Sequence, residues 1–430
     1  MELPAAKFPA IRGRNPQYIS PIPGHKLCQI ATCKTNYLWI NVRYRQLSSH
    51  RKISVSANLP KAFDSENRKK NGWIHFIGVG GCGISALAML ALRQGYEVSG
   101  SDIVWSSYMD ALKEAGSHFY IGHSELSLRK CNFSSSPNAI VVSSAIPTDN
   151  VEILYAMSVG IPVYKRGTWL GKLTEDYNLI AVSGSHGKST TASMLAYILK
   201  GMGDNLTAVI GAQVPQFGGG NVIHGNSHNF VLEADEYDSC FLELSPHVAV
   251  VTNVDWEHVD IFQDEQAVET VLRKFLGKIR NGGHLVFCGD RNDQNRGAYT
   301  LLCDPKQVLS ISDHMELCDA HLLNNNYRFT TYGMLNYNEW HASSVCFNPH
   351  GDISLRVPGV HNVLNSLAVV ATISSFFGDE RQFYESIDVK FHLNKFEGVF
   401  RRFEMISAVN GCHIYDDYAH HPNSKANVSI

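Results

Sequence analysis

The sequence predicts an α/β protein in which two nucleotide-binding domains follow one another, and three observations support this class. A glycine-rich turn of the form G-x-G-x-x-G follows a buried strand at 73–78. A phosphate-binding loop, GSHGKSTT at 184–191, follows a second buried strand at 179–183. Around both motifs, short apolar runs alternate with helical stretches, a pattern typical of a parallel, doubly wound sheet.

Length and composition exclude several other classes of protein. A chain of 430 residues has room for two to four domains at about 100–200 residues each. With 44% hydrophobic and 18% charged residues it is not wholly disordered, and a net charge of −3 provides no basic field for nucleic acid. No apolar run reaches the roughly 18–20 residues of a membrane-spanning helix. The ten cysteines form no C-x-x-C pair, which argues against a paired-ligand zinc site and favours a reducing compartment.

The first seventy residues differ from the rest in charge. After Glu2 the next acidic residue is Asp64, and ten lysines and arginines lie between them. Arg-rich, Ser-containing, acid-poor N-termini are typical of organelle transit peptides, so a chloroplast or other plastid is expected. The alternative is a basic tail with no address and a cytoplasmic protein. In either case residues 1–70 are predicted to be a disordered extension outside the fold.

Residues 71–177 are predicted to form a Rossmann-like domain. The glycines at 78, 80 and 83 let the backbone turn tightly and approach a pyrophosphate at the start of the next helix. Asp102 ends the second strand at the spacing of a ribose-binding acid. Ser143 and Ser144 follow a later strand, where they either face the nucleotide or simply end the strand. The motif does not identify the nucleotide, and a nicotinamide cofactor is the default expectation.

Residues 178–395 are predicted to form a second, ATP-binding domain of the phosphate-loop type. The loop is shorter than G-x-x-x-x-G-K-[ST], with two residues between Gly184 and Gly187. Its backbone amides would cradle phosphate oxygens, Lys188 would supply a positive charge, and the Ser189 hydroxyl could bind Mg²⁺. The alternative is a helix start with a chance lysine.

Three further segments carry candidate ligands for this domain. Glu233 and His258 follow apolar strands, where ligands for Mg²⁺ are expected beside a phosphate loop. The acids at 235, 236 and 238 could equally cap a helix. Asn362 and Asn365 open a later helix as two exposed amides, which either cap it or contact a base or phosphate.

With these residues identified, the chain resembles the Mur ligases, in particular those that add alanine, although a tripeptide-recycling relative shares several motifs. The matching segments occur in family order from about 72 to 422. They are GVGGCGIS at 78–85, SSAIP at 143–147, GSHGKSTT at 184–191, EADEYDSCFLELSP at 233–246, TNVDWEHVDIF at 252–262, GVHNVLNSLA at 359–368, FEGVFRRFE at 396–404 and DDYAHHP at 416–422.

The resemblance implies a role for each matched position, with ATP and Mg²⁺ as cofactors. The implied catalytic residues are Lys188, His258 and Arg402, and the implied metal ligands are Ser189, Glu233 and His258. ATP would contact Gly184, Ser185, His186, Gly187, Lys188, Ser189, Thr190, Asn362 and Asn365. A UDP-sugar, in place of a nicotinamide cofactor, would contact Gly78, Gly80, Gly81, Gly83, Ser85, Asp102, Ser143 and Ser144.

The implied reaction is the ATP-dependent joining of L-alanine to UDP-N-acetylmuramate, a step of peptidoglycan precursor synthesis. These two small molecules are the expected partners, with no nucleic acid and no membrane insertion. The family has a third, C-terminal domain, of which residues 396–430 would be only the beginning. The alternative expectation is therefore a catalytically incomplete remnant that binds nucleotide and UDP-sugar. A dehydrogenase is disfavoured by the phosphate loop in the second domain.

Overall fold

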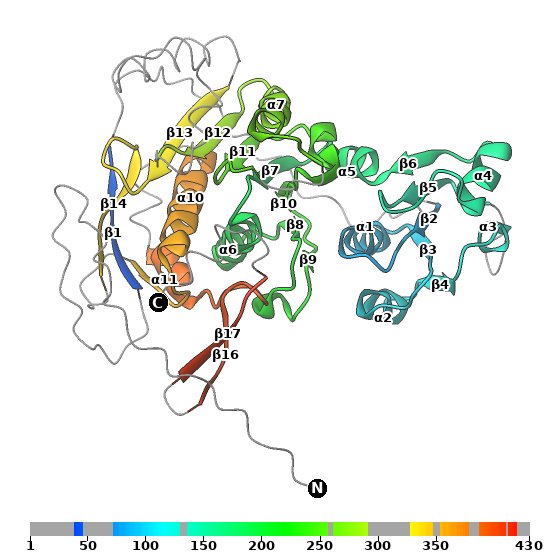
Figure 1. Ribbon diagram of the computed structural model, residues 1–430, viewed down its shortest axis with the longest axis horizontal. Helices are drawn as coiled ribbons and strands as arrows, with labels where there is room; N and C mark the ends of the chain where they lie inside the picture. Colours follow the sequence, from blue (N-terminus) through cyan, green and yellow to red (C-terminus); the bar gives the residue numbers. More distant parts are fainter. Residues whose placement is uncertain are drawn as a thin grey trace, which may run out of the picture.

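The structure is a computed structural model, and it describes residues 38–45, 72–129, 136–256, 261–290, 327–346, 353–377, 387–409 and 412–418. Figure 1 shows a smaller lobe, a larger lobe and a C-terminal hairpin, and each is built around its own sheet. Strands and helices alternate along both lobes, which confirms the predicted α/β class.

The smaller lobe holds a five-stranded sheet in the order β4-β3-β2-β5-β6, in which every neighbouring pair is parallel. Strand β2 is buried at all of its positions, as expected for a central parallel strand covered on both faces. The order reverses between β2 and β5, where doubly wound sheets bind their ligands. The elements are β2 (Trp73–Ile77), α1 (Cys82–Arg93), β3 (Glu97–Asp102), α2 (Ser107–Glu114), β4 (His118–Ile121), α3 (Leu126–Arg129), β5 (Ala139–Val142), α4 (Val151–Ser158), β6 (Val163–Lys165) and α5 (Arg166–Thr174).

The larger lobe holds a ten-stranded sheet in the order β15-β1-β14-β13-β12-β11-β7-β10-β8-β9, with a parallel centre from β14 to β8 and antiparallel pairs towards both edges. Helices cover both faces (Figure 1). The elements are β7 (Asn178–Ser183), α6 (Lys188–Gly201), β8 (Thr207–Val209), η1 (Pro215–Phe217), β9 (Val222–Ile223), β10 (Asn229–Glu233), η2 (Tyr237–Glu243), β11 (Val248–Val251), α7 (Glu265–Leu276), β12 (His284–Cys288), β13 (Arg328–Gly333), β14 (Trp340–Cys346), β15 (Ile353–Leu355), α10 (Val360–Phe377) and α11 (Ile387–Lys395).

Strand β1 (Leu38–Tyr44) corrects the expectation that residues 1–70 lie outside the fold. It pairs antiparallel with both β14 and β15 and so forms part of the large sheet. Buried and more exposed residues alternate along its sequence, LWINVRY. The side chains of Leu38, Ile40 and Val42 are buried in the same core as α10. The expectation was wrong for this segment because the acid-poor composition of the whole stretch outweighed a short, period-two strand signal.

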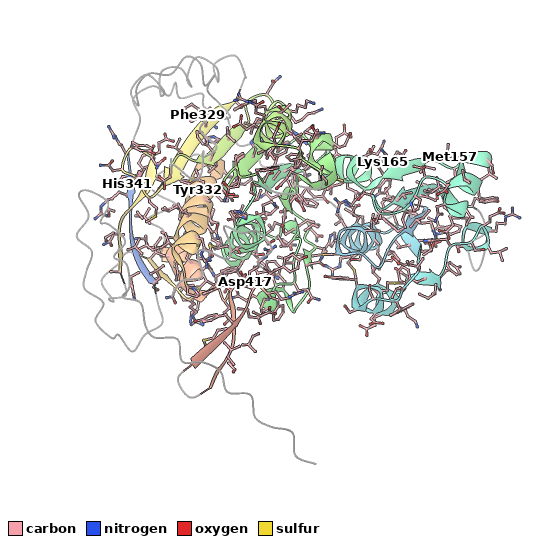
Figure 2. The ribbon with its side chains drawn as sticks, viewed as in Figure 1. Met157, Lys165, Phe329, Tyr332, His341 and Asp417 are labelled. Carbon is pink, nitrogen blue, oxygen red and sulfur yellow. The ribbon has the colours of Figure 1, made fainter. Side chains whose placement is uncertain are left out.

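Helix α10 has 18 residues and no Asp, Glu, Lys or Arg, so its length and composition alone would allow it to cross a membrane. It is instead a core helix, since 67% of it is buried, and it packs on α6 and on strands β12 and β13. Tyr332, labelled in Figure 2, is buried in the same core, and its hydroxyl donates to the carbonyl oxygen of Thr252 at 3.3 Å.

The last described segment is a hairpin of β16 (Glu404–Val409) and β17 (Cys412–Asp416), which pair antiparallel apart from the main sheets. The chain enters it through a turn at 400–403. This turn lies against the larger lobe, since the amide of Phe400 donates to the carbonyl of Gln213 at 3.1 Å. The hairpin is therefore anchored to the larger lobe at the end where the chain enters it.

Candidate functional site

The phosphate loop joins β7 to α6 and requires glycine at two positions. Gly184 and Gly187 have φ angles of +116° and +85°, in the left-handed region. A Cβ atom at Gly184 would lie 2.5 Å from Thr252 Oγ1, and one at Gly187 would collide with Asn365 Oδ1. Both positions therefore exclude a side chain by backbone conformation and by lack of space.

The segment that follows β11 holds this loop in place. The amide of His186 donates to Asn253 Oδ1 at 2.7 Å, and Asn253 Nδ2 donates back to the carbonyl of His186 at 2.8 Å. Ser185 Oγ donates to the carbonyl of Asp255 at 2.9 Å. Two residues predicted to contact ATP are thus tied to this scaffold, Ser185 by its hydroxyl and His186 by its backbone. The first turn of α6, which begins at Lys188, remains the place where a phosphate would meet helix amides.

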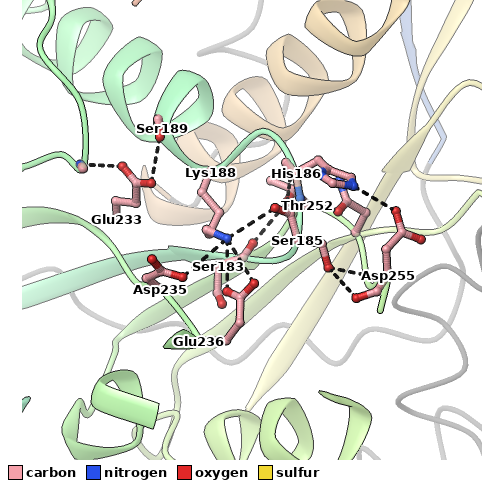
Figure 3. Close-up of polar contacts among 12 residues, drawn as sticks. Ser183, Ser185, His186, Lys188, Ser189, Glu233, Asp235, Glu236, Thr252 and Asp255 are labelled. Carbon is pink, nitrogen blue, oxygen red and sulfur yellow. Dashed lines mark hydrogen bonds and ion pairs between the residues drawn. The ribbon is translucent and has the colours of Figure 1, made fainter. Parts of the chain in front are cut away.

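Lys188 lies at the start of α6 and is almost fully buried. Its ammonium is 3.1 Å from both carboxylate oxygens of Glu236, 3.3 Å from the carbonyl of Ser185 and 3.7 Å from Asp235 Oδ1 (Figure 3). The Glu236 side chain makes no cap hydrogen bond to η2, so the cap interpretation of this residue is wrong. Burial raises the pKa of Glu236, and the charge of Lys188 opposes that rise.

Ser189, in the first turn of α6, lies beside Glu233, the last residue of β10. Ser189 Oγ donates to Glu233 Oε1 at 2.7 Å, and the amide of Gly211 donates to Glu233 Oε2 at 2.5 Å (Figure 3). A hydroxyl and a carboxylate are oxygen ligands of the type Mg²⁺ prefers, and Mg²⁺ commonly takes one or two carboxylates together with substrate phosphates. Within the described ranges, no three His, Cys, Asp or Glu side chains gather as a self-sufficient metal site. The pair fits a magnesium ion whose remaining ligands come from phosphate and water.

Arg402 reaches this pair from the other end of the chain. Its Nη2 lies 3.4 Å from Ser189 Oγ, and its guanidinium stacks over Tyr418 at 5.3 Å from the ring centroid. The turn that carries it is fixed by the amide of Phe403, which donates to Asp417 Oδ1 at 3.0 Å; Figure 2 labels Asp417 in this region. The structure thus brings together Lys188, Ser189, Glu233 and Arg402, whereas His258 lies outside the described residues.

The two asparagines of α10 are not the exposed amides that the sequence suggested. Asn362 and Asn365 are 4% and 6% exposed. Asn365 Oδ1 accepts from Thr191 Oγ1 at 3.2 Å, and its Nδ2 donates to Asn362 Oδ1 at 3.0 Å. The expectation failed because the helix face that carries them packs on α6. Asn365 lies directly against Gly187 of the phosphate loop, and Asn362 accepts its amide hydrogen bond from behind.

In the smaller lobe, the glycine-rich turn after β2 is shaped by Asp102. Its Oδ2 accepts the amide of Gly80 at 2.8 Å, and its Oδ1 accepts the amide of Val104 at 3.3 Å. The carboxylate predicted to bind a ribose therefore also holds the turn. Ser143 stands beside the turn, because a Cβ at Gly78 would lie 2.8 Å from its own Cβ. Ser144 is exposed, Ser85 is buried with its hydroxyl on the Cys82 carbonyl, and α1 begins one residue after Gly81.

A short series of contacts through Gly211 and Glu233 links the glycine-rich turn to the start of α6. Cys82, the first residue of α1, has its Sγ 3.6 Å from the carbonyl oxygen of Gly211. The amide of that same Gly211 donates to Glu233, the partner of Ser189. Asn221 Nδ2 adds a second contact from the larger lobe to Cys82, at 3.3 Å. Neither contact was predictable from the motifs, since Gly211 lies in a loop with no recognisable pattern.

Two family models match the chain over the parts that carry these loops. The Mur ligase family catalytic domain matches residues 73–178, and the Mur ligase middle domain matches residues 182–373. This chain belongs to the Mur ligase family. As a Mur ligase it is an ATP-dependent ligase by family, which excludes the dehydrogenase alternative.

Curated relatives of this Mur ligase are similar along most of their length. A UDP-N-acetylmuramate–L-alanine ligase of Frankia casuarinae is 37% identical over 379 residues, which are 81% of this chain and 72% of the relative. An enzyme of the same name from Clostridium acetobutylicum is 34% identical over 350 residues, 81% and 71% of the two chains.

Solved structures agree on the fold. The UDP-N-acetylmuramate–alanine ligase MurC of Thermotoga maritima superposes with a TM-score of 0.63 at 25% identity and covers 83% of this Mur ligase and 76% of its own chain. A UDP-N-acetylmuramate:L-alanyl-γ-D-glutamyl-meso-diaminopimelate ligase of Neisseria has a TM-score of 0.61 at 23% identity, covering 77% and 99% of the two chains. The second likeness supports the fold alone.

Proposed function

We propose that this Mur ligase uses ATP to join L-alanine to UDP-N-acetylmuramate, a step in peptidoglycan precursor synthesis. The relatives of that name, at 34–37% identity, support this substrate pair over the tripeptide-accepting alternative. The observation that carries the proposal is the link between the two phosphate-binding motifs, which runs from Cys82 through Gly211 and Glu233 to Ser189. A UDP-sugar at the glycine-rich turn and ATP at the phosphate loop would lie at the two ends of this link.

The chemistry needs two anions to approach each other. The muramate carboxylate attacks the γ-phosphorus of ATP, which forms an acyl phosphate and releases ADP. The alanine amine then attacks the acyl carbon, a tetrahedral intermediate forms, and phosphate leaves as the amide forms. Charge that builds up on transferring phosphoryl oxygens is stabilised by fixed cationic groups. Lys188, which precedes Ser189 in α6, and Arg402, which lies against the Ser189 hydroxyl, would supply such groups.

Ser189 and Glu233 would hold the magnesium ion. Bound there, Mg²⁺ would neutralise part of the negative charge of the ATP phosphates. Glu233 also orients the loop of Gly211 through its second oxygen, and Ser189 in turn faces Arg402. These residues would therefore orient the nucleotide and the loop between the two substrates as one unit.

The experiment that tests this function is ligation by the full chain. ATP, Mg²⁺, UDP-N-acetylmuramate and L-alanine are supplied together, and the product mass is followed alongside ADP release. We expect one product molecule for each ADP, and no ADP release without the sugar nucleotide. Binding of both nucleotides without any product would refute the ligase proposal and support the binding-remnant alternative. Lys188→Ala is the matched control, since it should abolish ATP binding and leave UDP-sugar binding unchanged.

We also propose an organellar address, on the basic and acid-poor composition that precedes β1. Because Leu38 begins a buried strand, cleavage of a leader should fall before that residue. Import into isolated plastids, followed by sequencing of the mature N-terminus, tests this. A mature N-terminus that begins after Leu38 would contradict it.

A further inference from the structure

The Lys188 ammonium has no spare donor in this structure. A lysine ammonium carries three N–H bonds. The two oxygens of Glu236 and the carbonyl of Ser185 lie at 3.1, 3.1 and 3.3 Å and together account for all three. Any phosphate that binds Lys188 must therefore take the place of at least one of these acceptors.

Glu236 is the acceptor that conflicts with a phosphate. It is 2% exposed and lies beside a site built for a polyanion, so its charge repels an incoming phosphate at low effective dielectric. Ser185, in contrast, offers a neutral carbonyl from within the loop itself. Asp235, the other nearby acid, is 3.7 Å from the ammonium, and its side chain is 46% exposed, so water screens it.

We infer that Glu236 is a positioning residue that acts through Lys188: it holds the ammonium by both carboxylate oxygens and competes with ATP phosphate for it. This inference rests on the proposed ATP site. It assigns to Glu236 the effect of weakening nucleotide binding at that site. A carboxylate in this position holds the buried Lys188 ammonium in place when no phosphate is bound. The free energy of separating the pair is then subtracted from that of ATP binding.

A purely structural role makes a different prediction. If Glu236 only stabilised the start of η2, its loss would lower stability and leave nucleotide affinity unchanged. If it competes for Lys188, its neutralisation leaves a buried ammonium with one strong acceptor fewer, and phosphate binding should become tighter. Affinity for nucleotide therefore separates the two roles.

The test compares the full-length wild type with Glu236→Gln by calorimetric titration with ATP and with ADP, each with Mg²⁺. We expect the dissociation constant for ATP to fall about tenfold in Glu236→Gln, the scale of one lost charge-assisted contact. Glu236→Asp keeps the charge and shortens the reach, so a gain of roughly two- to threefold is expected. Asp235→Asn is the matched control, and its affinity should change by less than about twofold, as for an exposed charge pair.

An unchanged or weaker affinity in Glu236→Gln would overturn the inference. Should that variant fail to fold, Glu236→Asp decides, and an affinity equal to or below that of the wild type overturns it. Failure of the proposed function looks different, since the wild type itself would then not bind ATP, or Lys188→Ala would bind it equally well.

Discussion

Arg402 Nη2 lies 3.4 Å from Ser189 Oγ, although 213 positions separate these two residues in the chain. The backbone on both sides of Arg402 is strained, because Arg401 and Phe403 have φ angles of 59° and 53° without being glycine. Such residues cost on the order of 1–3 kcal/mol each and persist where surrounding contacts hold them. The stacking of Phe403 on Tyr415, at 4.5 Å, is one such contact. The strained turn thus places the Arg402 guanidinium next to the phosphate loop.

Arg402→Ala should therefore reduce turnover far more than stability. A removed transition-state donor typically costs about 10²–10³ in rate, and we expect a loss of kcat in that range. ATP affinity should fall less, because Lys188 and the loop amides remain. Steady-state kinetics and calorimetric titration with ATP measure the two effects separately.

The matched control is its neighbour, Arg401→Ala. Arg401 shares the strained backbone, but its side chain is 62% exposed and forms a surface ion pair with Asp416 at 3.6 Å. Its replacement should leave kcat within about twofold, as expected for a surface pair. Equal losses in both variants would mean that the turn, and not the Arg402 guanidinium, matters.

The Ser189–Glu233 pair predicts a specific magnesium phenotype. Glu233→Gln keeps the size of the side chain and removes the charge, so the Mg²⁺ concentration for half-maximal activity should rise about 10- to 100-fold. Ser189→Thr retains the hydroxyl and should behave as the wild type, whereas Ser189→Ala should resemble Glu233→Gln. The measurement is a Mg²⁺ titration at saturating ATP. An unchanged Mg²⁺ requirement in Glu233→Gln would remove this residue from the metal site.

Much of this arrangement was predictable from local sequence. The phosphate-loop motif predicts a helix starting near Lys188, because glycines, a cation and a hydroxyl in that spacing suit phosphate, and α6 begins at this residue. The strand before Glu233 was likewise predictable from its apolar run, which ends in acids. In both cases neighbours in the chain determine the local structure.

The remaining features depend on contacts between distant segments. That Glu236 pairs with Lys188, and that Gly211 joins the two lobes, follows from tertiary packing that no local pattern encodes. The burial of Asn365 could not be predicted either, since helix periodicity does not reveal which face meets α6. Composition misled only at β1, where a seven-residue strand lies within a long basic stretch.

Glu152 gives the smaller lobe a pH-dependent stability. It is fully buried, which by itself would raise its pKa, but the nearby His75, the Ser101 hydroxyl at 2.5 Å and the amide of Ser124 lower the pKa to about 2. A folded-state pKa below the unfolded value near 4.5 contributes stability above pH 4.5, and that stability is lost as pH falls towards 2. Its size is up to about 3 kcal/mol.

Glu152→Gln should therefore be less stable at pH 7 and should lose less stability than the wild type between pH 4.5 and pH 2. Chemical denaturation at a series of pH values measures this difference. Glu125→Gln is the control, because Glu125 is 53% exposed and its pair with Arg129 is on the surface. A Glu152→Gln variant whose pH profile parallels the wild type would show that Glu152 does not carry the effect.

Strand β1 predicts a sharp boundary for N-terminal truncation. Removal of residues 1–37 leaves β1 intact, so stability and ATP binding should match the full chain. Removal of residues 1–46 also deletes β1, which exposes the unpaired edges of β14 and β15 and the core beneath Ile40. Burial of that isoleucine alone is worth about 1.5–3 kcal/mol, so the shorter chain should aggregate or unfold at a lower temperature.

A comparison of Ile40→Asp with Asn41→Asp tests the same point within the full chain, because only the first variant changes the buried face. Equal thermal midpoints for both truncations would show that β1 contributes nothing to the large sheet.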